Sequence, residues 1–311
     1  MTKEKMEAPA ELFKQTTIII CTVDRLANLE RCLESLQPFR EAVAEVIVVN
    51  NGSCHTAVEE IAMRHNARVA NEAGRGSGRA RNTGIRVARG NFIAFLDDDT
   101  QAGENWLQRL VAPLADSTLD CVLGAVRAEN PALAVHQAFE RLLCAGLPDA
   151  PTMLDARAAA DRFPLRMAMN GFTMNVAFRR DVFERFGYFD QRFGPGTRIR
   201  TGDDTELFFN VLRRGGRILF EPRAVVTHSW PTDWKAFRRS IFRAACSHTA
   251  ILTKYYLQEP SLRREILRYT ASRILRRWQV KSPSTPFRVP KLPFALGSLY
   301  GPVAFLLSRR K

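Results

Sequence analysis

Several signatures of familiar protein classes are missing from this sequence of 311 residues. Its six cysteines form no C-x-x-C pair, so a structural zinc site is not expected, and buried thiols are the ordinary interpretation. Residues 1–15 form a polar, charged N-terminal tail without an apolar stretch of signal-peptide length. We therefore expect a protein that stays in the cytoplasm.

Two common phosphate-binding motifs are also absent. The glycine-rich stretch EAGRGSGRARNTG, residues 72–84, fits neither the G-x-G-x-x-G spacing nor a G-K-[ST] ending. It still predicts a turn that leads into a helix, with Arg75, Arg79 and Arg81 nearby. Backbone N–H and guanidinium groups suit an anionic ligand, whereas the alternative is a loop before a solvated basic helix face.

Acidic residues are scarce near the C-terminus. Residues 231–311 contain 17 Lys and Arg against 3 acids, which leaves 29 basic and 29 acidic residues in the rest of the chain. The net charge of +14 therefore belongs to a basic extension, whose pattern is helical. Its uncharged run from Leu292 to Leu307 is interrupted by proline and glycine, and it is shorter than the roughly 20 apolar residues of a spanning helix. Either the extension attaches to the inner face of an anionic membrane, or its apolar face packs on the remaining chain.

Short apolar strands alternate with helical patterns through the first 126 residues. The runs TTIIICTV, EVIVVN and NFIAFLD are rich in β-branched and other apolar residues, and helical patterns lie between them. Such strands, joined by amphipathic helices, indicate an α/β fold with a parallel sheet covered on both faces. A variable connection follows over residues 127–166, in which the helical pattern AVHQAFERLL gives way to a stretch rich in proline and alanine without clear periodicity. A second ordered block follows it.

Polar residues that end the apolar strands are the first candidates for chemistry, because ligands of parallel sheets bind beyond the carboxyl ends of the strands. They are Thr22, Asp24, Arg25, Asn50, Asn51, Asn71 and the triplet Asp97, Asp98 and Asp99. Three adjacent carboxylates repel one another and lose hydration, a cost that a divalent cation offsets. Hard oxygen ligands favour Mg²⁺ or Mn²⁺ bridging to phosphates. The alternative is an acidic turn that caps the helix starting near Gly103.

The second block contains further candidates. Asp203 and Asp204 begin a helix after the loop RFGPGTRIRTG, and the helix dipole by itself favours acids at this position. A carboxylate beside such a loop can also act as a general base toward an incoming hydroxyl. His228 ends the apolar strand AVVTH, where an imidazole can bind a metal or a diphosphate or serve as an ordinary structural residue.

Taken together and in this order, these segments resemble family 2 glycosyltransferases, whose catalytic domain has the GT-A fold, a Rossmann-like mixed sheet flanked by helices. The resemblance covers residues 16–230 and runs through TVDRLANLERCLESL, EVIVVNNGS, GRARNTGIRVARGNFIAFLDDD, NVAFRRDVFERFGYFDQRFG, GDDTELFFNVLRRGG and AVVTH. It implies a nucleotide-binding half over 16–126, an acceptor and catalytic half over 127–230, and a separate basic helical extension over 231–311.

The resemblance also implies the reaction, an inverting transfer of a sugar from a nucleoside diphosphate donor, usually a uridine one, to a hydroxyl of a glycan or lipid-linked acceptor. The donor-binding residues that it implies are Thr22, Asp24, Arg25, Asn50, Arg81, Asp97 and Asp98. The implied ligands of Mg²⁺ or Mn²⁺ are Asp99, Asp97 and His228. Asp204 is the implied general base, with Asp203 as its acidic neighbour.

Three positions depart from the family pattern. Asn50 stands where Asp is common, so an amide replaces a carboxylate that would accept from a base N–H. Asp24 stands where Asn is frequent. Asp203 replaces the usual Glu of the acidic pair with a shorter side chain of the same charge.

Two other functions fit parts of the sequence. A sugar nucleotidyltransferase also combines an α/β nucleotide domain with acidic metal ligands, but TVDRLANLE lacks the expected triphosphate signature. A nucleic-acid-binding protein would use the basic extension, but no aromatic and basic recognition motif accompanies it. The resemblance implies a transferase of polysaccharide, glycolipid or cell-envelope glycan synthesis, and we expect no nucleic-acid partner.

Overall fold

The computed structural model describes residues 10–144, 147–154, 172–279 and 291–308. Most of the predicted N-terminal tail and the end of the predicted connection, residues 155–166, lie outside the described residues. The chain forms two compact units, the first from residues 1–191 and 203–230, the second from residues 192–202 and 231–311. The boundaries drawn from the sequence stay predictions.

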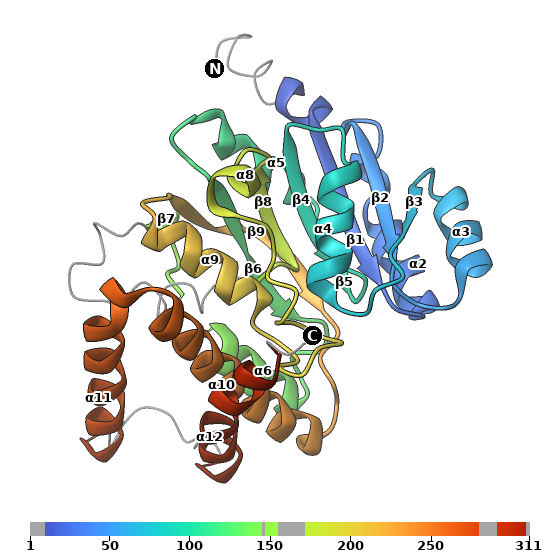
Figure 1. The fold of residues 1–311 in the computed structure, drawn as a ribbon. Coiled ribbons are helices and arrows are strands. Elements are labelled where there is room, and N and C mark those ends of the chain that lie inside the picture. Colours follow the sequence, from blue (N-terminus) through green and yellow to red (C-terminus); the bar gives the residue numbers. More distant parts are fainter. Residues whose placement is uncertain (1–9, 145–146, 155–171, 280–290, 309–311) are drawn as a thin grey trace. The chain divides into compact units, whose positions relative to one another are not determined.

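Four parallel strands form one half of the sheet of the first unit (Figure 1). In spatial order they are β3 (Arg68–Asn71), β2 (Glu45–Asn50), β1 (Thr16–Thr22) and β4 (Phe92–Asp97). Every residue of β2 is buried, and so are all but one in β1 and in β4, as expected of strands covered on both faces. The helices between these strands are α2 (Leu26–Ser35), α3 (His55–Arg64) and α4 (Ser77–Val87). The predicted α/β fold is confirmed.

The other half of the sheet is mixed. Strand β8 (Asn175–Arg179) runs antiparallel to both β4 and β6 (Cys121–Ala128), and β9 (Ile218–His228) runs parallel to β6. Two short strands, β5 (Thr100–Ala102) and β7 (Thr152–Leu154), pair antiparallel with β9. The helices of this half are α5 (Trp106–Val111), α6 (Ala134–Cys144), α8 (Val182–Phe186) and α9 (Asp203–Arg213).

A register shift between β6 and β9 depends on glycine and on a buried amide. The shift falls between Gly124 and Ala125, and a Cβ on Gly124 would lie 2.3 Å from the Ala224 oxygen. Asn175 Nδ2 donates to the carbonyls of Ala125 and Ala224 at 2.8 Å each. Its Oδ1 accepts from Trp106 Nε1 at 2.8 Å. One side chain thus ties β8 to β6, β9 and α5.

The second unit consists mainly of helices in its described part, together with the irregular segment Arg192–Gly202. Its helices are α10 (Trp234–Gln258), α11 (Arg263–Gln279) and α12 (Lys291–Ser308). Glycines let α12 lie closely along α10: a Cβ on Gly297 would be 2.2 Å from the Phe242 oxygen, and one on Gly301 would be 2.3 Å from the Cys246 oxygen. The predicted basic extension is therefore helical where the structure describes it.

Candidate active site

The turn between β4 and β5 sets the positions of the three strand-end carboxylates. Asp97 ends β4, and β5 begins at Thr100, which pairs with His228 of β9. This pairing brings Asp99 to the end of β9, where His228 Nε2 lies 3.2 Å from Asp99 Oδ1. The Ser229 N–H donates to the Asp99 carbonyl at 3.1 Å. A short strand thus unites two predicted site residues that are far apart in the sequence.

Asp98 is fully buried and joins this turn to the loop after β1. Its Oδ2 accepts from Thr22 Oγ1 at 2.6 Å and from Arg25 Nε at 3.1 Å. The Arg25 guanidinium also forms an ion pair with Asp99. Burial raises the pKa of Asp98 to about 7, although Arg25 and the Thr22 hydroxyl act in the opposite direction. The predicted donor residues Thr22 and Arg25 therefore lie directly against the carboxylates of the turn.

Asp99 and His228 have the chemistry of divalent cation ligands. Burial alone would raise the pKa of Asp99, but His228 and Arg25 hold it below its usual range, so the carboxylate stays ionised. Asp99 Oδ1 is buried and makes no well-directed hydrogen bond, which leaves this oxygen suited to a cation. Asp97 does not converge with them, and among the described residues no three His, Cys, Asp or Glu side chains already form a metal site.

A buried arginine connects the turn to helix α9. Arg81 Nη2 donates to Asp97 Oδ1 at 3.0 Å, and Arg81 Nη1 donates to Asp203 Oδ2. Ser77 Oγ donates to the same Asp203 oxygen at 2.7 Å. Burial would lower the pKa of Arg81, but Asp203 and Asp97 raise it above its usual value, so the guanidinium remains charged. The strand-end carboxylates and the acidic start of α9 therefore meet at one place in the first unit.

Asp204 lies close enough to this cluster to respond to its charges. Its Oδ1 accepts from the Thr205 N–H at 2.6 Å, in the first turn of α9. Burial and the neighbouring Asp203 raise the pKa of Asp204 to about 7, whereas Arg81 acts to lower it. A carboxylate that titrates near neutral pH is well matched to accepting a proton from a hydroxyl.

Asp24 and Asn50 hold the loops that follow β1 and β2. Asp24 Oδ1 accepts from the backbone N–H groups of Ser53 and Cys54, both at 2.8 Å. These bonds, that from Cys54 above all, lower the pKa of Asp24. Asn50 is buried, and its Oδ1 accepts from the Gly52 N–H at 3.0 Å. Contact of either residue with a nucleoside stays a prediction.

Asn51, a strand-end candidate, and Glu72, which the sequence did not single out, shape the glycine-rich loop. Asn51 Nδ2 donates to the carbonyls of Glu72 and Gly74 at 2.7 and 2.9 Å, and Asn51 Oδ1 accepts from the Gly76 N–H at 3.1 Å. The Glu72 carboxylate accepts from the Gly74 N–H at 2.7 Å and from the Thr83 hydroxyl at 2.6 Å. The position of Asn51 directly after an apolar strand marked it as a candidate in the sequence, whereas no sequence pattern marks Glu72.

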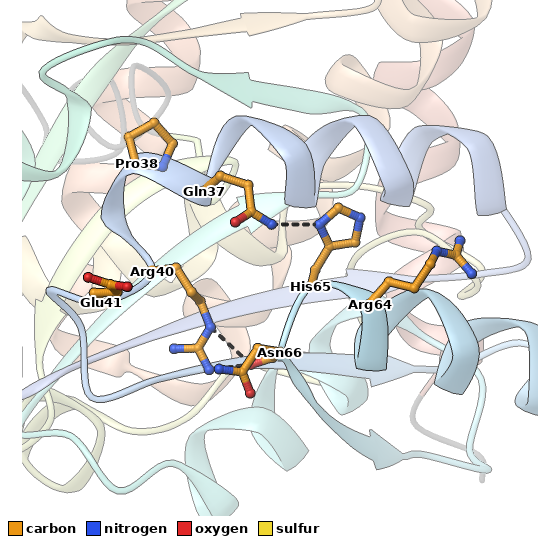
Figure 2. Close-up of a pocket in the computed structure, with 7 residues that line it drawn as sticks. All are labelled: Gln37, Pro38, Arg40, Glu41, Arg64, His65 and Asn66. Atoms are coloured by element: carbon orange, nitrogen blue, oxygen red, sulfur yellow. Dashed lines mark hydrogen bonds between the residues drawn. The ribbon is translucent and has the colours of Figure 1, made fainter.

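A polar hollow of about 300 Å³ lies elsewhere on the first unit (Figure 2). It is lined by Gln37, Pro38, Arg40, Glu41, Arg64, His65 and Asn66. Gln37 Nε2 lies 2.9 Å from His65 Nδ1, and Arg40 Nε donates to the Asn66 carbonyl at 2.9 Å (Figure 2). These residues precede β2 and β3, so the hollow is at the amino edge of the parallel strands. The carboxylates and Arg81 lie at the opposite, carboxyl edge, where ligands of such sheets bind.

Known proteins similar to this chain are glycosyltransferases. The pre-mycofactocin glycosyltransferase of Mycobacterium tuberculosis is 26% identical over 248 residues, which are 76% of this chain and 48% of that protein. The succinoglycan biosynthesis protein ExoM of Rhizobium meliloti is 30% identical over 183 residues, which are 56% of this chain and 52% of that protein. The chain thus spans about half the length of these curated relatives.

Solved structures with the same fold include two that contain Mn²⁺. The mannosyltransferase PcManGT from Pyrobaculum calidifontis, in complex with GDP-Man and Mn²⁺, has a TM-score of 0.57 and 19% identity, over 98% of this chain and 82% of that one. Glucosyl-3-phosphoglycerate synthase from Mycobacterium tuberculosis, in complex with Mn²⁺, UDP and glucosyl-3-phosphoglycerate, has a TM-score of 0.54 and 18% identity, over 78% of this chain and 83% of that one. The model of the family called glycosyl transferase family 2 matches residues 17–187, more than half of the sequence. The chain therefore belongs to glycosyl transferase family 2 and has the GT-A fold.

Proposed function

We propose that this enzyme transfers a sugar from a UDP-sugar to an acceptor hydroxyl with inversion at the anomeric carbon. The observation that carries the proposal is the bridge of Arg81 between Asp97 and Asp203. It unites the end of β4, where a donor diphosphate would bind, with the acidic start of α9, where an acceptor hydroxyl would lose its proton.

Residues of the turn would hold the donor and its cation. We assign Asp99 and His228 as ligands of Mg²⁺ or Mn²⁺, because Asp99 is ionised and its buried Oδ1 faces the His228 ring. A cation held there offsets the negative charge of the departing diphosphate. Similar solved structures contain Mn²⁺ with GDP-Man or UDP, which supports a nucleoside diphosphate donor.

Asp204 would act as the general base. Inversion by a single displacement needs one base on the side of the acceptor and a stabilised leaving group on the other, with no covalent intermediate. Asp204 has a pKa of about 7 and uses Oδ1 for the hydrogen bond from Thr205, which leaves Oδ2 to accept the proton of an acceptor hydroxyl. Asp203 stays paired with Arg81, so its role is to fix the helix start and to raise the pKa of Asp204.

A donor-binding experiment tests this assignment. The thermal unfolding midpoint should rise when UDP and Mn²⁺ are added together to the wild-type protein, because a ligand that binds only the folded state stabilises it. Asp99→Ala should lose the Mn²⁺-dependent part of the rise, whereas Asp116→Ala, at an exposed acid far from the turn in sequence, should keep it. If no nucleoside diphosphate raises the midpoint of the wild type with Mn²⁺, the donor site is wrongly assigned.

The acceptor would belong to polysaccharide, glycolipid or cell-envelope glycan synthesis. One relative is named as a succinoglycan biosynthesis protein, which supports a glycan acceptor. The exposed face of α12 supports attachment to the inner face of a membrane, where lipid-linked acceptors are found. Seven large apolar side chains on this face are between 38 and 74% exposed. They are Leu292, Leu296, Leu299, Tyr300, Val303, Leu306 and Leu307.

Attachment in the plane of the membrane suits α12 better than spanning it. Among the described helices it is the one that is long and apolar enough to cross a bilayer. However, its glycines lie against α10, which carries several charged residues, so α12 would have to leave α10 in order to span. Basic residues flank the apolar run at Lys291 and at 309–311, and each gains about 1 kcal/mol near an anionic surface.

Flotation with vesicles containing phosphatidylglycerol tests this attachment. Leu299→Glu should reduce flotation strongly, because it places a charge at the centre of the apolar face. Leu133→Glu, at an exposed leucine of the first unit, should float like the wild type. Equal flotation of all three proteins would exclude α12 as the membrane contact.

A further inference from the structure

Three arginines of the second unit act on one another and have no acidic partner among the residues that the structure describes. Arg239 and Arg243 belong to α10, and Arg200 belongs to the segment Arg192–Gly202 of the same unit. Among the described residues, none of the three forms an ion pair with a carboxylate. The segment contains three arginines and no acid, so its own side chains provide no countercharge.

The spacing along α10 and one close approach bring these arginines together. Arg239, Arg243 and Ser247 are four residues apart, so they lie in a row on one face of the helix. Gly202 packs against this row, and a Cβ on Gly202 would lie 2.6 Å from Ser247 Cβ. Arg200 precedes Gly202 by only two residues, so its backbone lies near this helix face, and its charge acts on Arg243.

The backbone of the segment is fixed at both ends. Phe193 packs on Phe305 of α12, with ring centroids 6.4 Å apart. Gly202 has a φ of +87°, in the left-handed region, where a side chain would also be strained. Arg200 has a φ of +67°, and its N–H donates to Thr197 Oγ1 at 3.2 Å. The contacts of Phe193 and Gly202 therefore fix the backbone on both sides of Arg200.

The three positive charges act on one another. Burial lowers the pKa of Arg243, and the charges of Arg200 and Arg239 lower it further. The three positive charges repel one another, and an anion bound between them would offset this repulsion. Guanidinium groups match a phosphoryl group in particular, because their planar donors pair with two oxygens at once.

We propose that Arg200, Arg239 and Arg243 bind a phosphoryl group, a phosphate monoester or diphosphate, carried by the acceptor. The inference rests on the proposed function, because it assigns this group to the molecule whose hydroxyl Asp204 would deprotonate. Arg200 precedes Asp204 by four residues, and four residues of fully extended chain span at most about 14 Å. A phosphate in a phospholipid headgroup has the same chemistry, so the test separates these two sources.

Calorimetric titration of the full chain with inorganic pyrophosphate in metal-free buffer tests the site. We expect Arg239→Gln and Arg243→Gln each to weaken pyrophosphate binding about tenfold, the effect of one lost charge-assisted hydrogen bond. Arg238→Gln removes the same charge from an adjacent position outside the row and should bind like the wild type. Arg239 is exposed, so its substitution is not expected to disturb folding, which thermal unfolding checks. Equal binding by the wild type, Arg239→Gln and Arg243→Gln would refute the site.

Vesicle binding and UDP binding complete the design. If the acceptor supplies the phosphate, Arg243→Gln should bind phosphatidylglycerol vesicles as the wild type does. Loss of vesicle binding with unchanged pyrophosphate binding would assign the arginines to lipid headgroups and overturn the proposal. UDP with Mn²⁺ should bind the wild type and Arg243→Gln equally. Failure of UDP to bind either protein would count against the donor site alone, and the pyrophosphate titration would still decide the arginine site.

Discussion

Replacing Arg81 with methionine tests the centre of the proposed site. The guanidinium is buried, lies 3.0 Å from Asp97 and also pairs with Asp203. Methionine keeps an unbranched stem but removes the charge and the donors, which leaves Asp203 buried without its cation. Removing one partner of a buried ion pair costs about 3–5 kcal/mol. We expect a loss of about 3 kcal/mol in the free energy of unfolding, at the low end, because the Asp97 side chain is 26% exposed and water can solvate it.

The same substitution should change the pH dependence of transfer. Arg81 lowers the pKa of Asp204, which burial and Asp203 raise to about 7. Without Arg81 this pKa rises further, so Asp204 becomes deprotonated only at higher pH. Because the base acts in its ionised form, the acidic limb of kcat/KM moves to higher pH. A limb displaced by one pH unit gives about tenfold lower activity at a fixed acidic pH.

Urea unfolding and pH profiles of transfer measure the two effects. Arg81→Lys is the matched control. Its ammonium can pair with Asp97 or with Asp203, but it cannot donate to both carboxylates at once as the guanidinium does. It should lose less stability than Arg81→Met and displace the pH profile less. If Arg81→Met unfolds at the wild-type urea concentration and keeps the wild-type acidic limb, Arg81 does not bridge the two acids.

Two further substitutions test the hydrogen bonds that hold the strands and loops around the site. Asn175→Ala removes three buried hydrogen bonds and should lower the free energy of unfolding by about 3 kcal/mol or more. The exposed Asn91→Ala should change it by no more than about 0.5 kcal/mol, and similar values for both would contradict the role of Asn175. Asp24→Ala removes the acceptor of the Ser53 and Cys54 amides, so hydrogen exchange at these amides should accelerate. Unchanged exchange there would show that Asp24 does not hold the loop.

The sequence predicts the parts of the site that are local. The buried strands β1, β2 and β4 are continuous apolar runs, so the polar residues that end them can be found without a structure. Family membership then favours a glycosyltransferase over the nucleotidyltransferase that the acidic strand end alone also allowed. The positions of Asp97, Asp98 and Asp99 were therefore predictable.

The contacts between distant segments were not predictable. Arg81 meets Asp203 across 122 residues, and a basic helix face gives no sign of which acid it will meet. Strand β5 has three residues, too few for a periodic pattern, yet it brings Asp99 to His228. Residues 192–202 belong to the second unit because Gly202 fits against Ser247, a steric match that composition does not reveal.

The number of residues in the turn between β4 and β5 determines whether Asp99 faces His228. Thr100, Gln101 and Ala102 pair with His228, Thr227 and Val226, and side chains on a strand alternate between its two faces. Inserting or deleting one residue between Asp97 and Thr100 would force either a bulge or a slip that turns each side chain of β5 to the other face. Most surface loops tolerate changes in length, whereas the length of this turn is fixed by the pairing of β5 with β9. A redesigned chain keeps Asp99 facing His228, the proposed metal ligands, only if the spacing from β4 to β5 stays constant.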